Sequence, residues 1–217
     1  MSLDSIVAAA IAVADAEGLG SVSMQRIADE LGATKMSLYR YTPGKAELTA
    51  VMLDTAIGAR PDLTTFGGGW RAGLKAWAAA LRDAMVLHPW ALELAVGARV
   101  LGPNELDWTE AGLLALATTP LTGGERLDAL ALITAHVRGM IQQSIGPDGI
   151  TLRPEHGADM LMADILASHA GRYPAVAAAF ADARANHAQD NADRFGLERI
   201  LDGLEVAMGE RRRTSSG

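Results

Sequence analysis

The chain has 217 residues, 49% of them hydrophobic but only 5% aromatic, and a formal net charge of -7. This length can form one or two domains with a substantial core, and an aliphatic, Ala-rich composition favours helices. The absence of cysteine excludes a disulfide framework and a cysteine-based metal site. Neither a signal peptide nor a run of about twenty apolar residues that could span a membrane is present. By elimination, we expect a cytoplasmic protein.

The first helix is predicted over residues 4–17, where small and branched residues recur at helical spacing. Gly18 and Gly20 end it, because glycine enters the left-handed conformation that closes a helix. The sequence opens almost directly with this helix. Its predicted buried stripe is Ile6, Ala9, Ala10, Val13 and Ala14.

Two short helices with a tight corner between them are predicted from Ser23 to Lys45. Ser23 is the expected N-cap of the first, and Gly32 ends it. The apolar stripe of this helix is Met24, Ile27, Ala28 and Leu31.

Thr34 is the expected cap of the second short helix, which Pro43 stops. Met36 and Leu38 are expected to point back to the core. Lys35, Ser37, Tyr39 and Arg40 are expected to project outward. Gly44 and Lys45 open a further helix over residues 45–57, which leads out of this domain.

A helix, a glycine-containing turn and a short donor-rich helix make the helix-turn-helix arrangement, in which the second helix enters the DNA major groove. Lysine can donate to guanine edges, and the amides that open the following helix favour a phosphate. The alternative is an ordinary corner, since helix-Gly-helix turns with surface Lys, Tyr and Arg occur in many all-α proteins.

Residues 6–54, IVAAAIAVADAEGLGSVSMQRIADELGATKMSLYRYTPGKAELTAVMLD, closely resemble the N-terminal domain of the tetracycline-repressor (TetR) family of bacterial transcription regulators. The resemblance implies that the helix before the turn contributes Gln25 and that Lys35 and Met36 read base edges. Phosphate contacts would come from Ser37, Tyr39, Tyr41 and Lys45, with Thr34 and Arg40 completing the DNA-binding set. Tyr41 replaces the commoner histidine. For Tyr39, packing in an amphipathic helix is the alternative.

The charge of this domain is unusual for a DNA-binding protein. Residues 1–54 hold four cations against seven acids, whereas phosphate neutralisation normally supplies much of the affinity. A two-fold dimer would concentrate the cations on one face, because a local patch suffices. Many family members also carry a basic arm before the first helix. We therefore expect either modest affinity or residues upstream of this chain. The cations are Arg26, Lys35, Arg40 and Lys45.

Glycine, proline and polar residues mark a linker over residues 58–69. The predicted domains are therefore a DNA-binding head at 1–57, a ligand-binding and dimerisation domain at 70–209, and a disordered tail at 210–217. Further helices are predicted from Trp70 to His88 and over residues 89–101, 104–116, 124–145, 156–171, 174–186 and 191–208, with a looser stretch at 146–154. No strand pattern is convincing, so the predicted fold is all-α: a three-helix head followed by a helical bundle.

The second domain resembles, more weakly, the C-terminal domain of the tetracycline repressor subclass. The shared features are Gly69-Trp70, residues 97–99, Arg138-Gly139 and the run FGLERILDGLE at 195–205. The resemblance implies that helices 124–145 and 191–208 pair with their copies in a four-helix bundle, aided by Gly139 and Gly203. Two heads of this homodimer would then meet successive major grooves of a pseudo-palindromic operator. The apolar residues of the two helices are Leu127, Leu130, Ala131, Ile133, Thr134, Val137 and Ile141, and Leu197, Ile200, Leu201, Leu204 and Met208.

The same resemblance implies an apolar effector pocket with a few polar anchors. Its expected lining is Trp77, Leu81, Leu94, Arg99, Trp108, Ala111, His136 and Met140. The alternative for each Trp and Met is an ordinary core residue, and for His136 a hydrogen-bonded structural histidine. Ala95 stands where the subclass has its metal-binding histidine, and alanine cannot ligate a metal. We therefore expect an uncharged or aromatic, mostly hydrophobic effector rather than tetracycline, and no cofactor or metal.

The predicted function is a transcriptional repressor whose homodimer leaves operator DNA when a small molecule binds the second domain. One alternative is a ligand-binding or adaptor dimer without specific DNA binding. An enzyme is the other alternative, but no metal-ligand spacing, nucleophile elbow or phosphate loop occurs. We therefore expect no catalytic residues.

Overall fold

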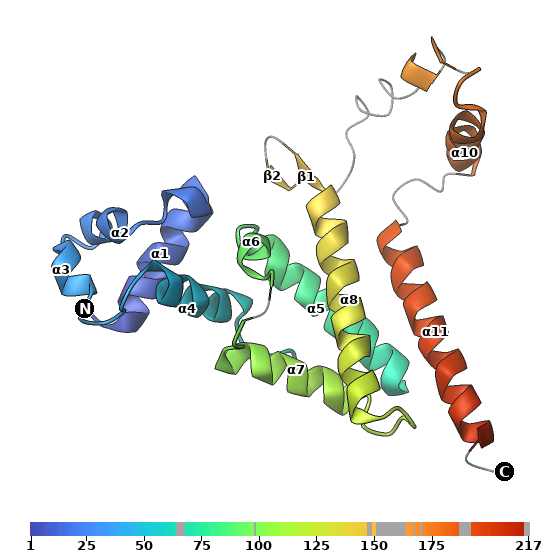
Figure 1. The fold of residues 1–217 in the computed structure, drawn as a ribbon, viewed down its shortest axis with the longest axis horizontal. Helices are drawn as coiled ribbons and strands as arrows, with labels where there is room; N and C mark the ends of the chain where they lie inside the picture. Colours follow the sequence, from blue (N-terminus) through green and yellow to red (C-terminus); the bar gives the residue numbers. More distant parts are fainter. Residues whose placement is uncertain are drawn as a thin grey trace.

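The computed structural model describes residues 1–63, 68–97, 99–146, 149–150, 164–166, 168–169, 171–186 and 192–214. Its helices form an elongated arrangement with the N-terminal helices at one end and the long helices α5, α8 and α11 towards the other (Figure 1). The all-α prediction is confirmed, and no helix of the described part is long and apolar enough to cross a membrane.

The head consists of α1 (Leu3–Glu17), a short 3-10 turn (Leu19–Ser21), α2 (Met24–Glu30), α3 (Lys35–Leu38) and α4 (Lys45–Ile57). A positive φ was expected for the glycines that end α1 and α2. Gly18 has a φ of 82° and Gly32 a φ of 59°. The stripe of α1 is buried as expected, with Val7 added and Ala9 only partly covered. The fully buried side chains of the head include Ile6, Ile27, Leu38, Leu48 and Met52.

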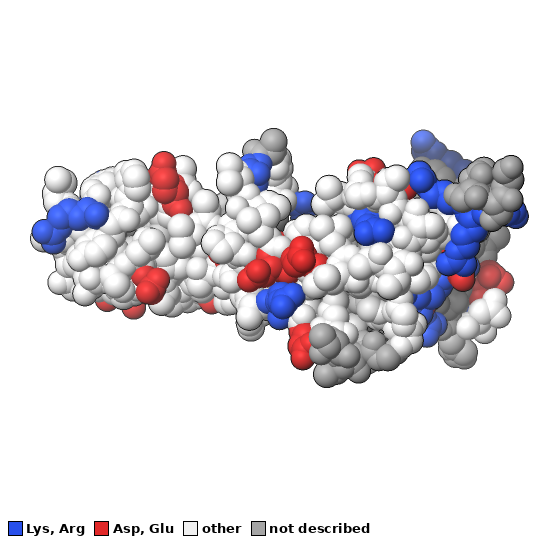
Figure 2. All heavy atoms as spheres, turned by 90° about the horizontal axis from the view of Figure 1, so that it is seen from below, with Lys and Arg blue, Asp and Glu red and all other residues white. Residues whose placement is uncertain are grey.

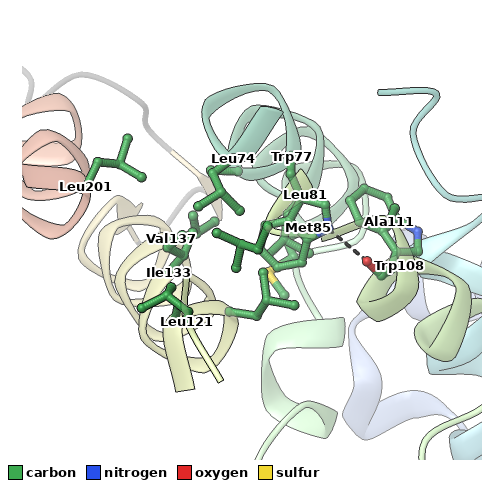
Figure 3. Packing of buried hydrophobic residues seen from close by; sticks show 14 of the residues in the cluster. Leu74, Trp77, Leu81, Met85, Trp108, Ala111, Leu121, Ile133, Val137 and Leu201 are labelled. Atoms are coloured by element: carbon green, nitrogen blue, oxygen red, sulfur yellow. Dashed lines mark hydrogen bonds between the residues drawn. The ribbon is translucent and has the colours of Figure 1, made fainter. Parts of the chain in front are cut away.

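The second domain consists of α5 (Gly69–Leu87), α6 (Ala91–Leu94), α7 (Pro103–Ala115), α8 (Gly123–Gln143), α10 (Pro174–Ala185) and α11 (Ala192–Thr214). Helices α5, α7 and α8 surround one apolar core, against which α11 packs (Figure 3). Gly112 makes this packing possible, since a Cβ there would lie 2.6 Å from a methyl of Leu130. Gly196 has the same role between α11 and α8, where a Cβ would lie 2.3 Å from the ring of His136.

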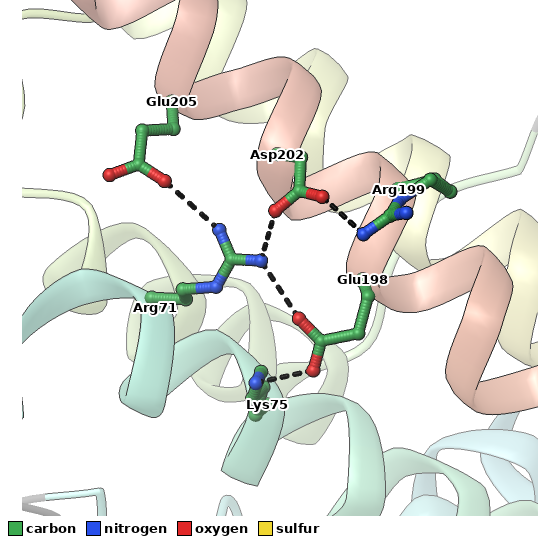
Figure 4. Close-up of polar contacts among 6 residues, drawn as sticks. All are labelled: Arg71, Lys75, Glu198, Arg199, Asp202 and Glu205. Atoms are coloured by element: carbon green, nitrogen blue, oxygen red, sulfur yellow. Dashed lines mark hydrogen bonds and ion pairs between the residues drawn. The ribbon is translucent and has the colours of Figure 1, made fainter.

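An ion-pair cluster fastens α11 to α5 (Figure 4). The guanidinium of Arg71 contacts Glu198 at 2.8 Å and Glu205 at 3.2 Å, and it also pairs with Asp202. Lys75 lies 2.5 Å from the other oxygen of Glu198. The hydrogen bond from Lys75, and after it the one from Arg71, lower the pKa of Glu198 to about 2.

The helix predicted over residues 89–101 is wrong for most of its length. Among the described residues of this range, α6 is the only helix; it ends at Leu94, and Gly97 then takes a positive φ of 76° before α7. Trp90 and Ala91 belong to the apolar core of the head rather than to that of the second domain. The core of the head therefore draws on residues beyond the predicted linker.

Two smaller differences concern the C-terminal half. Ile145–Gly146 (β1) and Gly149–Ile150 (β2) form an antiparallel pair with Ile145 opposite Ile150, where no strand was expected. Helix α11 continues to Thr214, so residues 210–214 are helical and not a disordered tail. Most of the helix predicted over 156–171 lies outside the described residues, although 164–166 are helical. The helix predicted over 174–186 is confirmed as α10.

Candidate DNA interface and effector site

The helix-turn-helix of the head is fixed by two side-chain caps and one buried leucine. Ser23 accepts a hydrogen bond from the amide of Arg26 at 3.1 Å, and Thr34 accepts one from the amide of Ser37 at 3.3 Å. Both N-caps were predicted from the sequence. Leu38 is fully buried and anchors α3 to the head, which leaves the rest of this short helix facing solvent.

The side chains expected to meet DNA lie together around α3. Lys35, Tyr39, Arg40, Tyr41 and Lys45 are exposed, as are Thr34 and Gln25. The expectation that Met36 points to the core is wrong, since its side chain is 74% exposed. Tyr39 is 40% exposed, with the ammonium of Lys35 lying 5.9 Å from its ring centroid. These side chains therefore lie on an outward-facing surface of the head.

Two of the predicted donors already have partners within the head. The half-buried Ser37 donates its hydroxyl hydrogen bond to the main-chain oxygen of Thr34 at 2.5 Å. The side-chain amide of Gln25 donates to Asp29 at 2.8 Å. Ser37 has one hydroxyl hydrogen and would have to give up this bond to donate to DNA, whereas the Gln25 amide keeps a second N–H and its oxygen for such a contact.

The cations of the head divide into one that is paired and three that face solvent. Arg26 contacts Glu17 and Glu30, each at 2.7 Å, and these hydrogen bonds raise its pKa. Within the described residues, Lys35, Arg40 and Lys45 have no acidic partner within salt-bridge distance. Figure 2 shows Lys and Arg side chains at the far end of the head, with acidic side chains further back on this face.

The N-terminus of α4 adds backbone donors beside these cations. Its N-cap is Gly44, and no side chain caps the first turn. Free amides at a helix start favour an anion, and here Lys45 stands at the same place. Together with the exposed side chains of α3, this end of α4 forms a surface suited to a phosphate backbone.

Four of the residues expected to line an effector pocket come together in the core of the second domain. Trp77, Leu81, Trp108 and Ala111 are all buried (Figure 3). The indole of Trp77 donates to the main-chain oxygen of Trp108 at 2.9 Å, and the rings meet edge to face. In this structure Trp77, Leu81 and Trp108 pack as ordinary core residues, while Ala111 also lines the cavity described below.

The other four expected pocket residues make separate contacts. Leu94 packs against the core of the head, and Arg99 pairs with Glu105. The ring of His136 contacts the main-chain oxygen of Asp193 at 2.8 Å, so it acts as a structural histidine between α8 and α11. Met140 is half-buried on α8.

A cavity of about 400 Å³ lies beside this core. Pro61 and Leu63, Trp70 of α5 and Leu114 of α7 give it an apolar lining, and Arg60, Asp62 and Thr118 add polar groups. Only Ala111 of the predicted pocket residues reaches it. Sequence reasoning missed the cavity because the segment after α4 was assigned only to a linker. One available signal was Gly73, which lies against the small Ala115. The full lining is Arg60, Pro61, Asp62, Leu63, Gly69, Trp70, Gly73, Ala111, Leu114, Ala115 and Thr118.

Comparison with known proteins matches both halves of the chain. Residues 6–52 match the model of bacterial regulatory proteins of the tetR family, and residues 61–208 match the tetracyclin repressor-like C-terminal domain. The HTH-type transcriptional repressor DrrR1 of Streptomyces coeruleorubidus is 39% identical, with 100% of this chain and 82% of that protein covered. An HTH-type transcriptional regulator of Saccharopolyspora erythraea is 30% identical, with 96% and 86% covered.

Solved structures of ActR from Streptomyces coelicolor have the same fold. Apo ActR superposes with a TM-score of 0.80 at 24% identity, covering 97% of each chain. ActR in complex with actinorhodin gives a TM-score of 0.78 at 25% identity, covering 97% of this chain and 98% of that one. The helix-turn-helix head, the helical second domain and the two family matches lead to one conclusion: the chain is a transcription regulator of the TetR family, and not an enzyme.

Proposed function

We propose that this transcriptional repressor binds a pseudo-palindromic operator as a homodimer and leaves it when a small, mostly hydrophobic molecule occupies the second domain. The exposed surface of α3 and the start of α4 carries the proposal, because its three cations have no acidic partner among the described residues. The repressor acts in the cytoplasm, where the DNA is.

The DNA contacts are tested by an electrophoretic mobility shift with the DNA upstream of the chain's own gene, across a salt series. Specific binding should weaken steeply as salt rises, because cations that neutralise phosphates release counterions. Absent or salt-insensitive binding would favour the second candidate, an adaptor dimer without specific DNA binding. The surplus of acids in the head is the observation that favours this candidate.

The homodimer is proposed to form through the outer faces of α8 and α11. Leu127 and Leu132 on α8 are each 51% exposed, and Phe195 and Val206 on α11 are 60% and 61% exposed. Several of the apolar residues that the sequence analysis named for the four-helix bundle are instead buried within the chain: Leu130, Ile133, Val137, Ile141, Leu201 and Met208. Gly139 and Gly203 have nothing within 4 Å of an added Cβ, which leaves room for the close approach of a second copy.

Val206→Glu should dissociate this dimer, because it would place a carboxylate on the apolar face of α11 that is proposed to meet the second copy. Light scattering after gel filtration should then give the mass of one chain. The matched control is Leu106→Glu, since Leu106 is similarly exposed but lies on α7. Equal masses for Val206→Glu and the unsubstituted protein would exclude this interface.

The effector is proposed to enter the cavity between α5, α7 and residues 60–63. The cavity has aromatic, aliphatic and a few polar groups in its lining, as small-molecule sites commonly do. ActR has been solved with actinorhodin and with (S)-DNPA. We therefore propose molecules of this kind as effectors here.

Titration with actinorhodin, followed by tryptophan fluorescence and by release of bound DNA, tests this assignment. Leu114→Trp should fill the cavity and weaken actinorhodin binding, because Leu114 lines it. Leu106→Trp, at an exposed position of α7 that does not line the cavity, should leave binding unchanged. Equal binding by both variants would place the effector elsewhere.

A further inference from the structure

Hydrogen bonds join the last turns of α4 to the first turns of α7. The Asp54 carboxylate, only 9% exposed, accepts a hydrogen bond from the amide of Glu105 at 3.0 Å. The main-chain oxygen of Asp54 accepts another from the side chain of Asn104 at 2.9 Å. The indole of Trp108 donates to the main-chain oxygen of Gly58 at 3.0 Å. The two helices are therefore linked by directional bonds as well as by apolar contact.

Asp54 supplies the N-terminal cap that α7 lacks in its own sequence. The N-cap position of α7 is Gly102, which has no side chain to accept from the free amides of the first turn. A Cβ on Gly102 would lie 2.2 Å from the carboxylate carbon and Oδ1 of Asp54. The backbone there has φ -78° and ψ 173°, which any residue adopts. Glycine is thus required for the approach of Asp54 and not for the backbone.

Glu105 and Arg99 make further contacts at the start of α7, beside Asp54. Glu105 is buried, accepts a hydrogen bond from the amide of Gly102 at 3.1 Å and pairs with both terminal nitrogens of Arg99. The hydrogen bond to Glu105 has the larger effect in raising the pKa of Arg99, and the charge of the nearby Asp54 also helps to raise it. Arg99 therefore balances two neighbouring carboxylates and fixes the loop before α7.

We infer that Asp54 is a positioning residue that transmits effector binding to the DNA-binding head by capping α7 from α4. This inference rests on the proposed function, in which the effector fills the cavity. The cavity is bounded by α5, by the C-terminal half of α7 and by residues 60–63, which lie a few positions beyond the end of α4. Helix α7 is a rigid rod of about 20 Å. Movement of its far end by an effector is carried to its capped end, and from there to α4.

The size of the contact suits this role. A hydrogen bond to a buried charged group and a typical coupling between two binding sites each change an equilibrium by on the order of ten- to a hundredfold. A bond of this size that is made in one state of the protein and weakened in the other is enough to account for a typical coupling between two sites.

Coupling is reciprocal, so DNA can serve as the only ligand in the test. Hydrogen–deuterium exchange of the full chain is measured with and without a duplex carrying the upstream sequence. In the unsubstituted protein, DNA should change the exchange of α7 peptides that line the cavity. In Asp54→Ala this change should shrink at least about fivefold, the lower end of typical coupling. Asp54→Asn keeps a side-chain oxygen that accepts from the Glu105 amide, so it should retain most of the change.

Gly102→Ala provides an independent test, because it keeps every polar group but forces Asp54 away. It should lose coupling as Asp54→Ala does, and the double variant should lose no more than either single one, since both remove the same contact. Asp107→Ala is the control, because Asp107 is an exposed acid on the same helix. If Asp54→Ala does not fold, judged by circular dichroism, Gly102→Ala carries the test.

The outcomes separate the inference from the proposed function. An unsubstituted protein that does not bind DNA overturns the proposed function. If the unsubstituted protein binds DNA but the exchange of its α7 peptides does not change, the role of Asp54 alone is overturned. The same holds if the exchange of the Asp54→Ala and Gly102→Ala variants changes as much as that of the unsubstituted protein. Additive losses in the double variant also overturn it.

Discussion

The indole N–H of Trp77 donates to the main-chain oxygen of Trp108, with ring centroids 6.3 Å apart (Figure 3). The indole N–H of Trp108 donates to the main-chain oxygen of Gly58. These two bonds connect α5 to α7 and α7 to the end of α4. Two residues expected to surround an effector therefore tie three helices together in this structure.

Trp108→Phe should destabilise the protein while preserving most of the core packing. Phenylalanine cannot donate to Gly58, which would leave a partly buried carbonyl without its partner, at a cost of about 1–3 kcal/mol. Urea unfolding followed by circular dichroism measures the free energy. An unchanged midpoint would mean that water replaces the indole at no cost.

Gly112→Ala should destabilise the second domain by about 1–3 kcal/mol, because overpacking forces neighbours apart. Its Cβ would meet Leu130 and lie 3.3 Å from Trp77. Gly124→Ala is the matched control, since it lies in α8 with nothing within 4 Å of the added atom. Thermal unfolding of both variants should separate them. Similar melting temperatures would contradict the tight packing of α7 on α8.

Acid should loosen α11 through Glu198. Its pKa of about 2 lies below the ordinary 4.5, so its ion pairs stabilise the fold above about pH 4.5. This stabilisation is lost as the pH falls towards 2, when the carboxylate takes up a proton. Glu198→Gln should therefore be less stable than the unsubstituted protein at pH 7 and approach it at low pH. Chemical unfolding over this range measures the difference, with Glu110→Gln, at an exposed acid of α7, as the control.

Lys35→Ala and Lys45→Ala should weaken DNA binding in different ways. Loss of a base contact at Lys35 should relax sequence discrimination by about 1–3 kcal/mol, whereas loss of a phosphate contact at Lys45 should weaken all sequences alike and reduce the salt slope by about 1. Arg26→Gln is the control, because Arg26 is already paired with Glu17 and Glu30. Mobility shifts with specific and random duplexes distinguish the variants. Unchanged affinity in both lysine variants would contradict the assigned contacts.

The local signals in the sequence were reliable where one residue type decides the structure. Ser23 and Thr34 cap their helices, Gly32 turns the chain, and Leu38 anchors α3, all as predicted. These features depend on neighbours a few residues away, which a single sequence contains. The same sequence placed Met36 in the core, because a four-residue helix offers too few turns to define its inner face.

Contacts between distant segments could not be predicted in this way. The ring of His136 contacts the main-chain oxygen of Asp193 on α11, although His136 was expected beside an effector. The capping of α7 by Asp54 joins residues about fifty positions apart, and only Gly102 hinted at a close approach. The cavity could not be predicted from the sequence either, because its lining comes from three separate segments: α5, α7 and the residues after α4.

The burial of Trp90 and Ala91 among the side chains of α1 and α4 has a consequence for engineering. A fragment cut after α4 would expose the apolar surface that these residues cover, and the indole bond from Trp90 to Asp15 at 2.6 Å would be missing. A chimera that joins this DNA-binding head to the ligand-binding domain of another protein should therefore keep Trp90 and Ala91, or have other apolar residues that cover the same surface.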